Sequence, residues 1–183
     1  MSATKQKIWT YNDYSKLDDD KRYEIIEGEL TEMSPSPREI HRAISINLGT
    51  IINIHVKENQ LGKIYAAPFD LILDNKNVVQ PDLMFISKER KKIITDGGIF
   101  GSPDLLIEIL SPSTSKRDRE VKFRLYEKFQ VAEYWIIDPV KSKIEIYNLE
   151  DEKYRLSCSV QNNETVQSIV LSSVSVTYNN LVE

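Results

Sequence analysis

The chain has 183 residues, of which 40% are hydrophobic and 28% charged, and its formal net charge is −4. These values fit one globular domain with its own core, and no apolar run approaches the roughly 20 residues that span a bilayer. A single cysteine excludes an intramolecular disulfide and a cysteine zinc cluster, and because no apolar signal core opens the chain, a cytoplasmic location is expected.

Residues 1–36 are predicted to form an N-terminal extension of the single domain that spans residues 1–183. A short helix is expected near Tyr11 to Leu17, and the following residues form a hairpin of two strands, one on each side of a Gly-Glu turn. The stretch Ser34-Pro35-Ser36-Pro37 then breaks the chain, with its second serine as a helix cap and its second proline at the first helical position.

The core is predicted over residues 37–139 and begins with a long helix at about 38–58. Gly62 is expected to end this helix, through which apolar residues recur at helical spacing. Two extended segments, residues 63–73 and 78–87, are expected to pair as one hairpin, because the four residues between them have the chemistry of a turn. The polar stretch that follows, up to Ser102, is expected to be a long loop or a lid.

A buried strand over residues 104–110 is followed by a helix near 115–130, which Ser113 or Thr114 is expected to cap. The next apolar strand, residues 133–138, is expected to run parallel to the first, because a helix connects the two. Residues 140–183 add short strands at 143–148, 153–160 and 166–171. The order of elements predicts an α/β or α+β domain, a mixed sheet flanked by helices.

Glu108 interrupts an otherwise apolar strand. An ionised carboxylate buried there costs several kcal/mol unless a cation, a metal or hydrogen bonds meet it. Asp82 lies on the preceding extended segment after Pro81, which lacks an amide donor, so the sheet ladder is expected to break there and the carboxylate to turn into a cleft. Two carboxylates at the ends of neighbouring strands suit Mg²⁺ or Mn²⁺.

The helix after the Glu108 strand carries Asp118, Lys122 and Tyr126 at i, i+4 and i+8, on one stripe. This stripe lies beside an apolar one of Val121, Leu125 and Phe129. From the edge of the buried face, Lys122 can reach back over the sheet and stabilise charge that develops on a phosphate. The alternative is a surface ion pair between Asp118 and Lys122, worth a few tenths of a kcal/mol.

Several segments share a pattern: Gln80-Pro81-Asp82, residues 103–114, the Asp118, Lys122 and Tyr126 stripe, residues 133–139, and at the N-terminus residues 23–30 and Ser34-Pro35 with His41. Together they resemble a large bacterial family of restriction-endonuclease-like proteins, formerly a domain of unknown function, in the PD-(D/E)XK nuclease superfamily. The resemblance implies a restriction-endonuclease-like core of helix, three-stranded meander, helix and strand.

The resemblance also implies roles for single residues. Asp82 matches the metal-binding aspartate and Glu108 the metal-binding acidic residue. The lysine of the pattern normally stands two positions after that acid, where this chain has Leu110. Lys122 resembles a variant in which the lysine has moved to the following helix.

Four further residues are placed near the site: His41, Asp104, Asp118 and Tyr126. His41 is kept there by the resemblance, although a lone histidine is more often a surface or capping residue. Asp104 shares the face of its strand with Glu108. Glu24 and Glu27 reach the cleft only if the N-terminal hairpin lies over it, which strand alternation alone does not establish.

The leading hypothesis is a metal-dependent endonuclease acting on DNA, with Mg²⁺ or Mn²⁺ held by Asp82 and Glu108 and with Lys122 assisting. The acidic net charge and Leu110 favour an alternative, a catalytically inactive nuclease-like module that binds nucleic acid or a protein partner. In a third reading Glu108 is only the buried ion-pair partner of Lys122. A homodimer is expected from the sheet edges left by the terminal strands and from the two sites that a double-strand cut needs.

Overall fold

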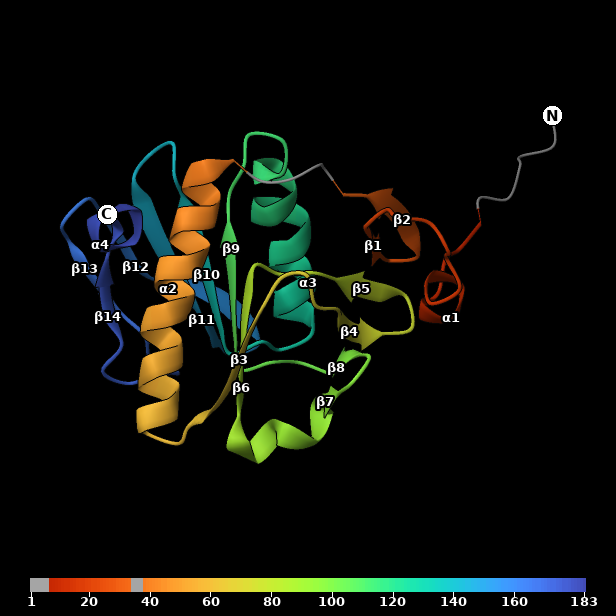
Figure 1. The fold of residues 1–183 in the computed structure, drawn as a ribbon, viewed down its shortest axis with the longest axis horizontal. Helices are drawn as coiled ribbons and strands as arrows, with labels where there is room; N and C mark the ends of the chain where they lie inside the picture. The colour runs from red at the N-terminus through yellow and green to blue at the C-terminus, as the bar shows by residue number, and fades with distance from the viewer. Residues whose placement is uncertain (1–6, 34–37) are drawn as a thin grey trace.

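The structure, a computed structural model, describes residues 7–33 and 38–183. In this part of the chain the strands form two six-stranded sheets and a two-stranded ribbon (Figure 1). The main sheet has, from edge to edge, the strands β12 (Lys153–Gln161), β11 (Lys143–Glu150), β10 (Glu133–Asp138), β9 (Leu105–Ile109), β6 (Leu83–Ser87) and β3 (Gly62–Ala66). The second sheet has the strands β2 (Glu29–Glu32), β1 (Tyr23–Ile26), β5 (Asn77–Val79), β4 (Leu71–Asp74), β8 (Gly98–Phe100) and β7 (Ile94–Thr95).

Helices flank the main sheet, as the predicted fold class requires. The helical elements are α1 (Tyr11–Tyr14), α2 (Glu39–Glu58), the 3₁₀ helix η1 (Lys88–Ile93), the π-helical segment η2 (Arg117–Lys122), α3 (Phe123–Lys128) and α4 (Tyr178–Val182). The ribbon pairs β13 (Thr165–Gln167) with β14 (Ser175–Thr177). No helix within the described ranges is long and apolar enough to cross a membrane.

The main sheet separates two hydrophobic cores because side chains alternate along each strand. On β9, Leu105, Ile107 and Ile109 belong to the core that α2 covers. Leu106 belongs to the core on the other face, which α3 and parts of the second sheet cover. Glu108 shares the parity of Leu106, so its carboxylate faces the α3 side of the sheet.

The predicted single hairpin of residues 63–87 is wrong, because the chain crosses between the sheets twice. β3 and β6 pair with each other in the main sheet, whereas β4 and β5 form their own hairpin in the second sheet. Pro68 stands where the chain leaves the main sheet, and Pro81 where it returns. Proline has no amide donor for a ladder, so each proline ends the pairing on its side.

The stretch predicted as a loop or lid, residues 88–102, is built into the second sheet. It contains η1, β7 and β8, and β8 runs parallel to β4. The amides of Ile99 and Gly101 donate to the carbonyls of Asp70 and Ile72 at 2.8 and 2.9 Å. Gly98 has a φ of +141°, and a Cβ there would lie 2.7 Å from the Asp70 carbonyl, so the close approach requires glycine.

The helix after β9 forms at the predicted place, but its first half is the π-helical segment η2. A π turn holds more residues than an α turn, which displaces the following side chains around the helix axis. Val121, expected in the apolar stripe, is therefore 44% exposed, while Lys122 is 4% exposed. The alternative of a surface pair between Asp118 and Lys122 is wrong, because both side chains are buried.

The remaining predictions of helices, strands and helix ends are partly confirmed. The N-terminal hairpin, the long helix and the parallel pairing of β9 with β10 are present. Gly62 lies in β3 and does not end α2; Gln60, at a φ of 52°, follows the helix instead. Thr114 precedes the first helical residue as expected, and its carbonyl accepts a hydrogen bond from the Asp118 amide at 3.0 Å. Its amide donates to the Ser111 hydroxyl in a local turn. The expected cap and proline at residues 36 and 37 lie outside the described residues.

The C-terminal segment is fastened to the main sheet by Glu133, the first residue of β10, which is 0% exposed. Its carboxylate accepts hydrogen bonds from Trp135 Nε1 at 2.6 Å and Ser168 Oγ at 2.7 Å. The amides of Ile169 and Val170 donate to its other oxygen at 2.8 and 3.1 Å. A buried carboxylate is stabilised in this way without a cationic partner.

We predict that Glu133→Gln lowers the free energy of unfolding by about 2–4 kcal/mol, because an amide leaves buried donors unpaired. Urea denaturation measures this. The matched control is Glu150→Gln, whose exposed ion pair with Arg155 is worth about 0–1 kcal/mol. Equal stability of the Glu133→Gln variant and the wild type would contradict the role assigned to Glu133.

Candidate active site

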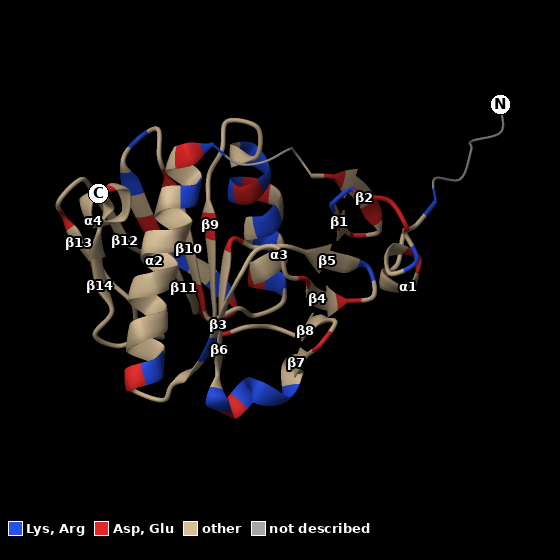
Figure 2. Cartoon of the chain, in the orientation of Figure 1, with Lys and Arg blue, Asp and Glu red and all other residues tan. Residues whose placement is uncertain are grey.

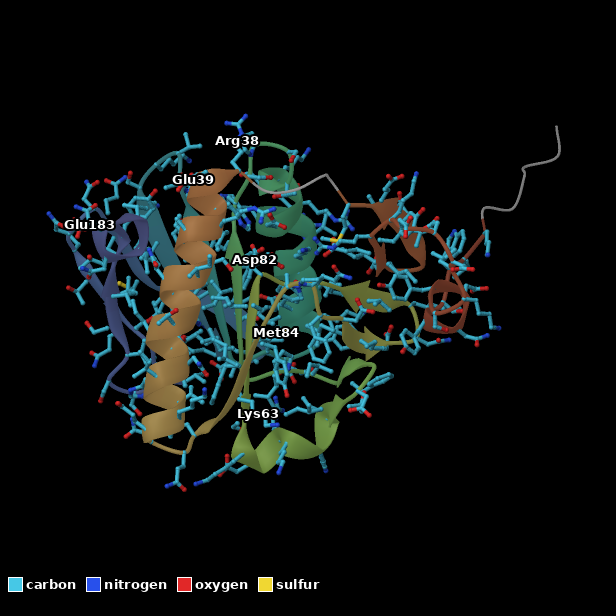
Figure 3. The ribbon with its side chains drawn as sticks, in the orientation of Figure 1. Arg38, Glu39, Lys63, Asp82, Met84 and Glu183 are labelled. Carbon is cyan, nitrogen blue, oxygen red and sulfur yellow. The ribbon has the colours of Figure 1, made fainter. Side chains whose placement is uncertain are left out.

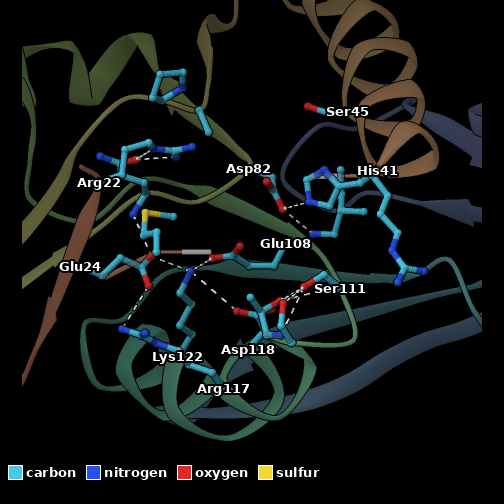
Figure 4. Close-up of a pocket in the computed structure, with 18 of the residues that line it drawn as sticks. Arg22, Glu24, His41, Ser45, Asp82, Glu108, Ser111, Arg117, Asp118 and Lys122 are labelled. Carbon is cyan, nitrogen blue, oxygen red and sulfur yellow. Dashed lines mark hydrogen bonds and ion pairs between the residues drawn. The ribbon is translucent and has the colours of Figure 1, made fainter. Parts of the chain in front are cut away.

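A cavity of about 820 Å³ opens at the end of the main sheet where β9 stops (Figure 4). Its walls are the first turns of α2, the β1–β2 hairpin and the turn that leads from β9 into η2. Figure 3 shows Asp82 between α2 and the helix formed by η2 and α3. Asp82, Glu108 and Lys122 all line this cavity, so the structure brings the three predicted catalytic residues together.

The ammonium of Lys122 lies among three carboxylates from different parts of the chain. Its Nζ is 2.8 Å from Glu24 Oε1 and 3.0 Å from Glu108 Oε1. Asp118 Oδ1 lies 3.7 Å from the same nitrogen. Burial by itself would lower the pKa of Lys122, but the three carboxylates together raise it above its ordinary value. Lys122 is therefore a cation in the folded protein.

Glu108 combines deep burial with two hydrogen-bond donors. Its Oε1 accepts from Tyr126 Oη at 2.7 Å as well as from Lys122. Burial raises the pKa of Glu108 well above its usual range, against the pull of the Lys122 charge. Asp118, Lys122 and Tyr126 lie on the side of the helix that faces Glu108, as the predicted stripe requires. All three are buried.

Asp82 bridges the sheet and α2. Its Oδ2 accepts a hydrogen bond from the Ile109 amide at 2.7 Å and lies 3.3 Å from His41 Nε2. Burial opposes the charged form of His41, but the bond to Asp82 outweighs burial and raises the pKa of the imidazole. His41 therefore belongs to the wall of the cavity, as the resemblance implied, and is not a surface residue.

Asp104 is placed elsewhere. It stands before β9, at the strand end opposite the cavity, and its Oδ2 accepts from the Ser87 amide at 2.7 Å. It shares strand parity with Glu108, but four residues of a strand extend over about 13 Å. Asp104 is thus not among the residues that line the cavity.

Glu24, whose position the sequence left open, lies at the site. It lies on β1 and is 2% exposed. Besides Lys122, it meets Arg117 Nη2 at 3.1 Å and the Gln80 amide at 3.1 Å. Burial opposes its charge, yet the two cations and the amide outweigh burial and hold the pKa of Glu24 below its usual value. The available signal was the one that marked Glu108, a carboxylate in an apolar strand of buried residues.

Basic side chains occur both at the cavity and away from it. Arg117 pairs with Glu24 at the cavity, and Arg22 donates to Gln80 Oε1 from another wall. Arg38, at the start of α2, is exposed and lines the same cavity. The basic residues of η1, by contrast, lie at the bottom of the view in Figure 2, outside the cavity.

The donor atoms at the cavity floor fit a hard divalent cation. Asp82 Oδ1 and Glu108 Oε2 have no hydrogen-bond partner among the described residues. In the described ranges no three acidic, histidine or cysteine side chains are arranged to hold a metal by themselves. Mg²⁺ needs no such cage, since it is commonly bound by one or two carboxylates and keeps several waters. Two carboxylate oxygens beside open space meet that requirement.

The comparison with solved structures defines the class of fold. A protein of Anabaena variabilis ATCC 29413, described as "a putative nuclease belonging to DUF820", matches this chain with a TM-score of 0.77. The two are 22% identical, and the match covers 94% of this chain and 97% of the other. The fold is therefore nuclease-like.

The chain belongs to the Uma2 family, described as "Putative restriction endonuclease", whose profile matches residues 10–178. This confirms the resemblance seen in the sequence. Two proteins of Synechocystis sp. (strain PCC 6803) are also similar, and both are described as uncharacterized. The protein sll1609 is 25% identical over 151 residues, covering 80% of this chain and 84% of its own length. The protein slr1290 is 28% identical over 168 residues, covering 88% and 85%.

We predict that Lys122→Met lowers the free energy of unfolding by about 3–5 kcal/mol near pH 8, because it leaves buried carboxylates without their cation. Burial raises the pKa values of Glu108 and Asp118, and the Lys122 charge opposes this rise, so both pKa values are higher still in the variant. The folded state then takes up protons before the unfolded state as the pH falls, so the deficit shrinks toward about pH 5. Urea denaturation at both pH values measures this. Lys128→Met, at a 60% exposed side chain, is the control, and an equal deficit at both pH values would contradict the prediction.

We predict that Glu24→Gln destabilises the protein by about 2–3 kcal/mol at neutral pH, since it removes the charge that Lys122 and Arg117 share. Hydrogen exchange should show faster opening of the β1–β2 hairpin. Glu27→Gln is the matched control on the same hairpin, because the Glu27 side chain is 75% exposed and lies 4.0 Å from Lys128. A similar small change in both variants would show that Glu24 does not fasten the hairpin to the helix.

Proposed function

We propose that this protein is a metal-dependent endonuclease that hydrolyses phosphodiester bonds in DNA, with Mg²⁺ or Mn²⁺ held by Asp82 and Glu108. One observation carries the proposal: Glu108 on β9 and Asp82 immediately before the neighbouring β6 meet at a cavity beside a buried lysine, and each has an oxygen left unpartnered among the described residues. The family description as a restriction endonuclease supports the reaction class.

Each of these residues has its own role in the proposed reaction. Asp82 and Glu108 hold the cation, which when bound polarises the scissile phosphate and lowers the pKa of a water. Lys122 carries a charge that stabilises the negative charge developing on the phosphate. Tyr126 and Glu24 fix the positions of Glu108 and Lys122 through the contacts given above. His41 orients Asp82 from the α2 side.

The contacts of Lys122 support a second candidate function, that of a catalytically inactive module. Its ammonium already has three carboxylate neighbours, and the usual lysine position is occupied by Leu110, which packs in the α3-side core. In that case Glu108 is an ion-pair partner and the cavity binds nucleic acid or a protein without cutting. Metal affinity separates the two candidates.

Self-association belongs to the proposal as well. β12 and β3 are the edge strands of the main sheet, and an uncovered edge strand offers its backbone groups to a second chain. A cut of both DNA strands by one assembly would require two such sites. Sedimentation of the purified protein gives the oligomeric state directly.

We predict that Mn²⁺ binds the wild-type protein saturably in calorimetry and that Glu108→Gln and Asp82→Asn abolish binding, because each removes a charged ligand. Cleavage of DNA should need the cation and should fall by at least about 100-fold in Glu108→Ala and Asp82→Ala. Asp104→Asn is the control, a carboxylate of the same strand face that does not line the cavity.

Two results would decide against catalysis. Mn²⁺ affinity that is equally weak in the wild type and in Glu108→Gln would identify a scaffold held by an ion pair. Saturable Mn²⁺ binding with wild-type cleavage in both alanine variants would place the chemistry at other residues.

A further inference from the structure

We infer that the DNA strand entering this cavity is unpaired, so that the protein acts on single-stranded segments and not on intact duplex. The inference rests on the proposed nuclease function and narrows its substrate class. It is carried by the depth of the site, by the apolar groups on its rim and by the balance of charge around it.

The reacting groups lie too deep for a duplex surface. The side chains of Glu108 and Lys122 are each 5% exposed, and that of Asp82 is 17% exposed. Walls from α2, the β1–β2 hairpin and the turn before η2 surround them. A volume of about 820 Å³ is in the range of cavities that enclose a small molecule. A single strand can bend one phosphate into such a space, whereas a duplex brings a second backbone and a stack of base pairs with it.

The rim offers surfaces that suit bases. Ile46 lines the cavity and is 67% exposed, and the exposed prolines Pro68 and Pro112 line other parts of it. Bases of a duplex are stacked inside, and its outer surface consists of sugars and phosphates. Unpaired bases expose their apolar faces, and the aliphatic side chains on the rim can bury part of such a face whatever the base.

The N-terminal end of α2 carries side chains for both phosphate and base contacts. Arg38 immediately precedes α2 in an extended conformation, and Arg42 and Ile46 follow at i and i+4 on the helix. All three line the cavity. A single strand lying along these side chains would place phosphates near the arginines and a base near the isoleucine. Proteins that bind single strands combine a cationic groove with aromatic side chains on which bases stack, and here Ile46 takes the position of the group that contacts a base.

The charge around the cavity also favours a single strand over a duplex. The chain carries a net charge of −4, and Glu24, Asp82, Glu108 and Asp118 surround the cavity floor. Duplex DNA has one negative charge per about 1.7 Å of its axis, twice the density of one strand. Five Lys or Arg and five Asp or Glu side chains line the cavity, so the site lacks the excess of cations that the higher charge density of a duplex requires.

The test compares one labelled oligonucleotide as a single strand, as a blunt duplex, and as a duplex with an unpaired arm. Binding to the full-length protein is measured by fluorescence anisotropy without added divalent cation, and cleavage is measured with Mn²⁺. We expect the single strand to bind at least about tenfold more tightly than the duplex, and cuts to fall in the unpaired arm.

Two variants of α2 provide the internal control. Ile46→Gln should weaken single-strand binding by about fivefold and leave duplex binding unchanged. Ile54→Gln should change neither, since Ile54 is also exposed, at 52%, on the same helix but does not line the cavity. Equal effects of the two variants would show that Ile46 does not contact the unpaired bases, which would contradict the inference.

The outcomes separate this inference from the proposed hydrolysis. A duplex that binds or is cut as well as the single strand overturns the inference, as does the absence of binding to all three substrates. Preferred binding of the single strand without cleavage of any substrate supports the inference and contradicts the nuclease proposal.

Discussion

The buried charge of Lys122 is the interaction on which the rest of the site depends. Its ammonium holds together Glu24 of the N-terminal hairpin, Glu108 of the main sheet and Asp118 of its own helix. None of these carboxylates is stable in its buried position without a cation nearby. The lysine therefore fixes the hairpin, the sheet and the helix relative to one another, and the cavity lies at the point where they meet.

The π-helical segment explains how this lysine reaches the site from a helix. A regular helix would place Val121 toward the core and leave Lys122 at its edge. The additional residue in the turn exposes Val121 and buries Asp118 and Lys122. Such segments are frequent at functional sites, because they reorient side chains at the expense of regular hydrogen bonding. Leu110, at the position where the resemblance implies a lysine, packs in the core.

The four carboxylates at the cavity floor exceed the cations that neutralise them. Lys122 and Arg117 provide two positive charges, and His41 provides a third only when protonated. A site with surplus negative charge and an open side is suited to receive a further cation together with an anionic substrate. In the proposed function Asp82 and Glu108 hold that cation, while Glu24 pairs with Lys122 and Arg117.

Local patterns in the sequence were enough to predict the order of the main elements and to propose Asp82, Glu108 and Lys122 as site residues. Glu108 stood out because local alternation reveals a charge in a buried strand, and Asp118, Lys122 and Tyr126 followed from helical spacing. The packing of distant segments places Glu24 beside Lys122, sets Asp104 at the far end of its strand and divides residues 63–102 between two sheets. Periodicity reports the face of one element, whereas these outcomes depend on which elements pack together, a balance of burial and charge over contacts distant in sequence.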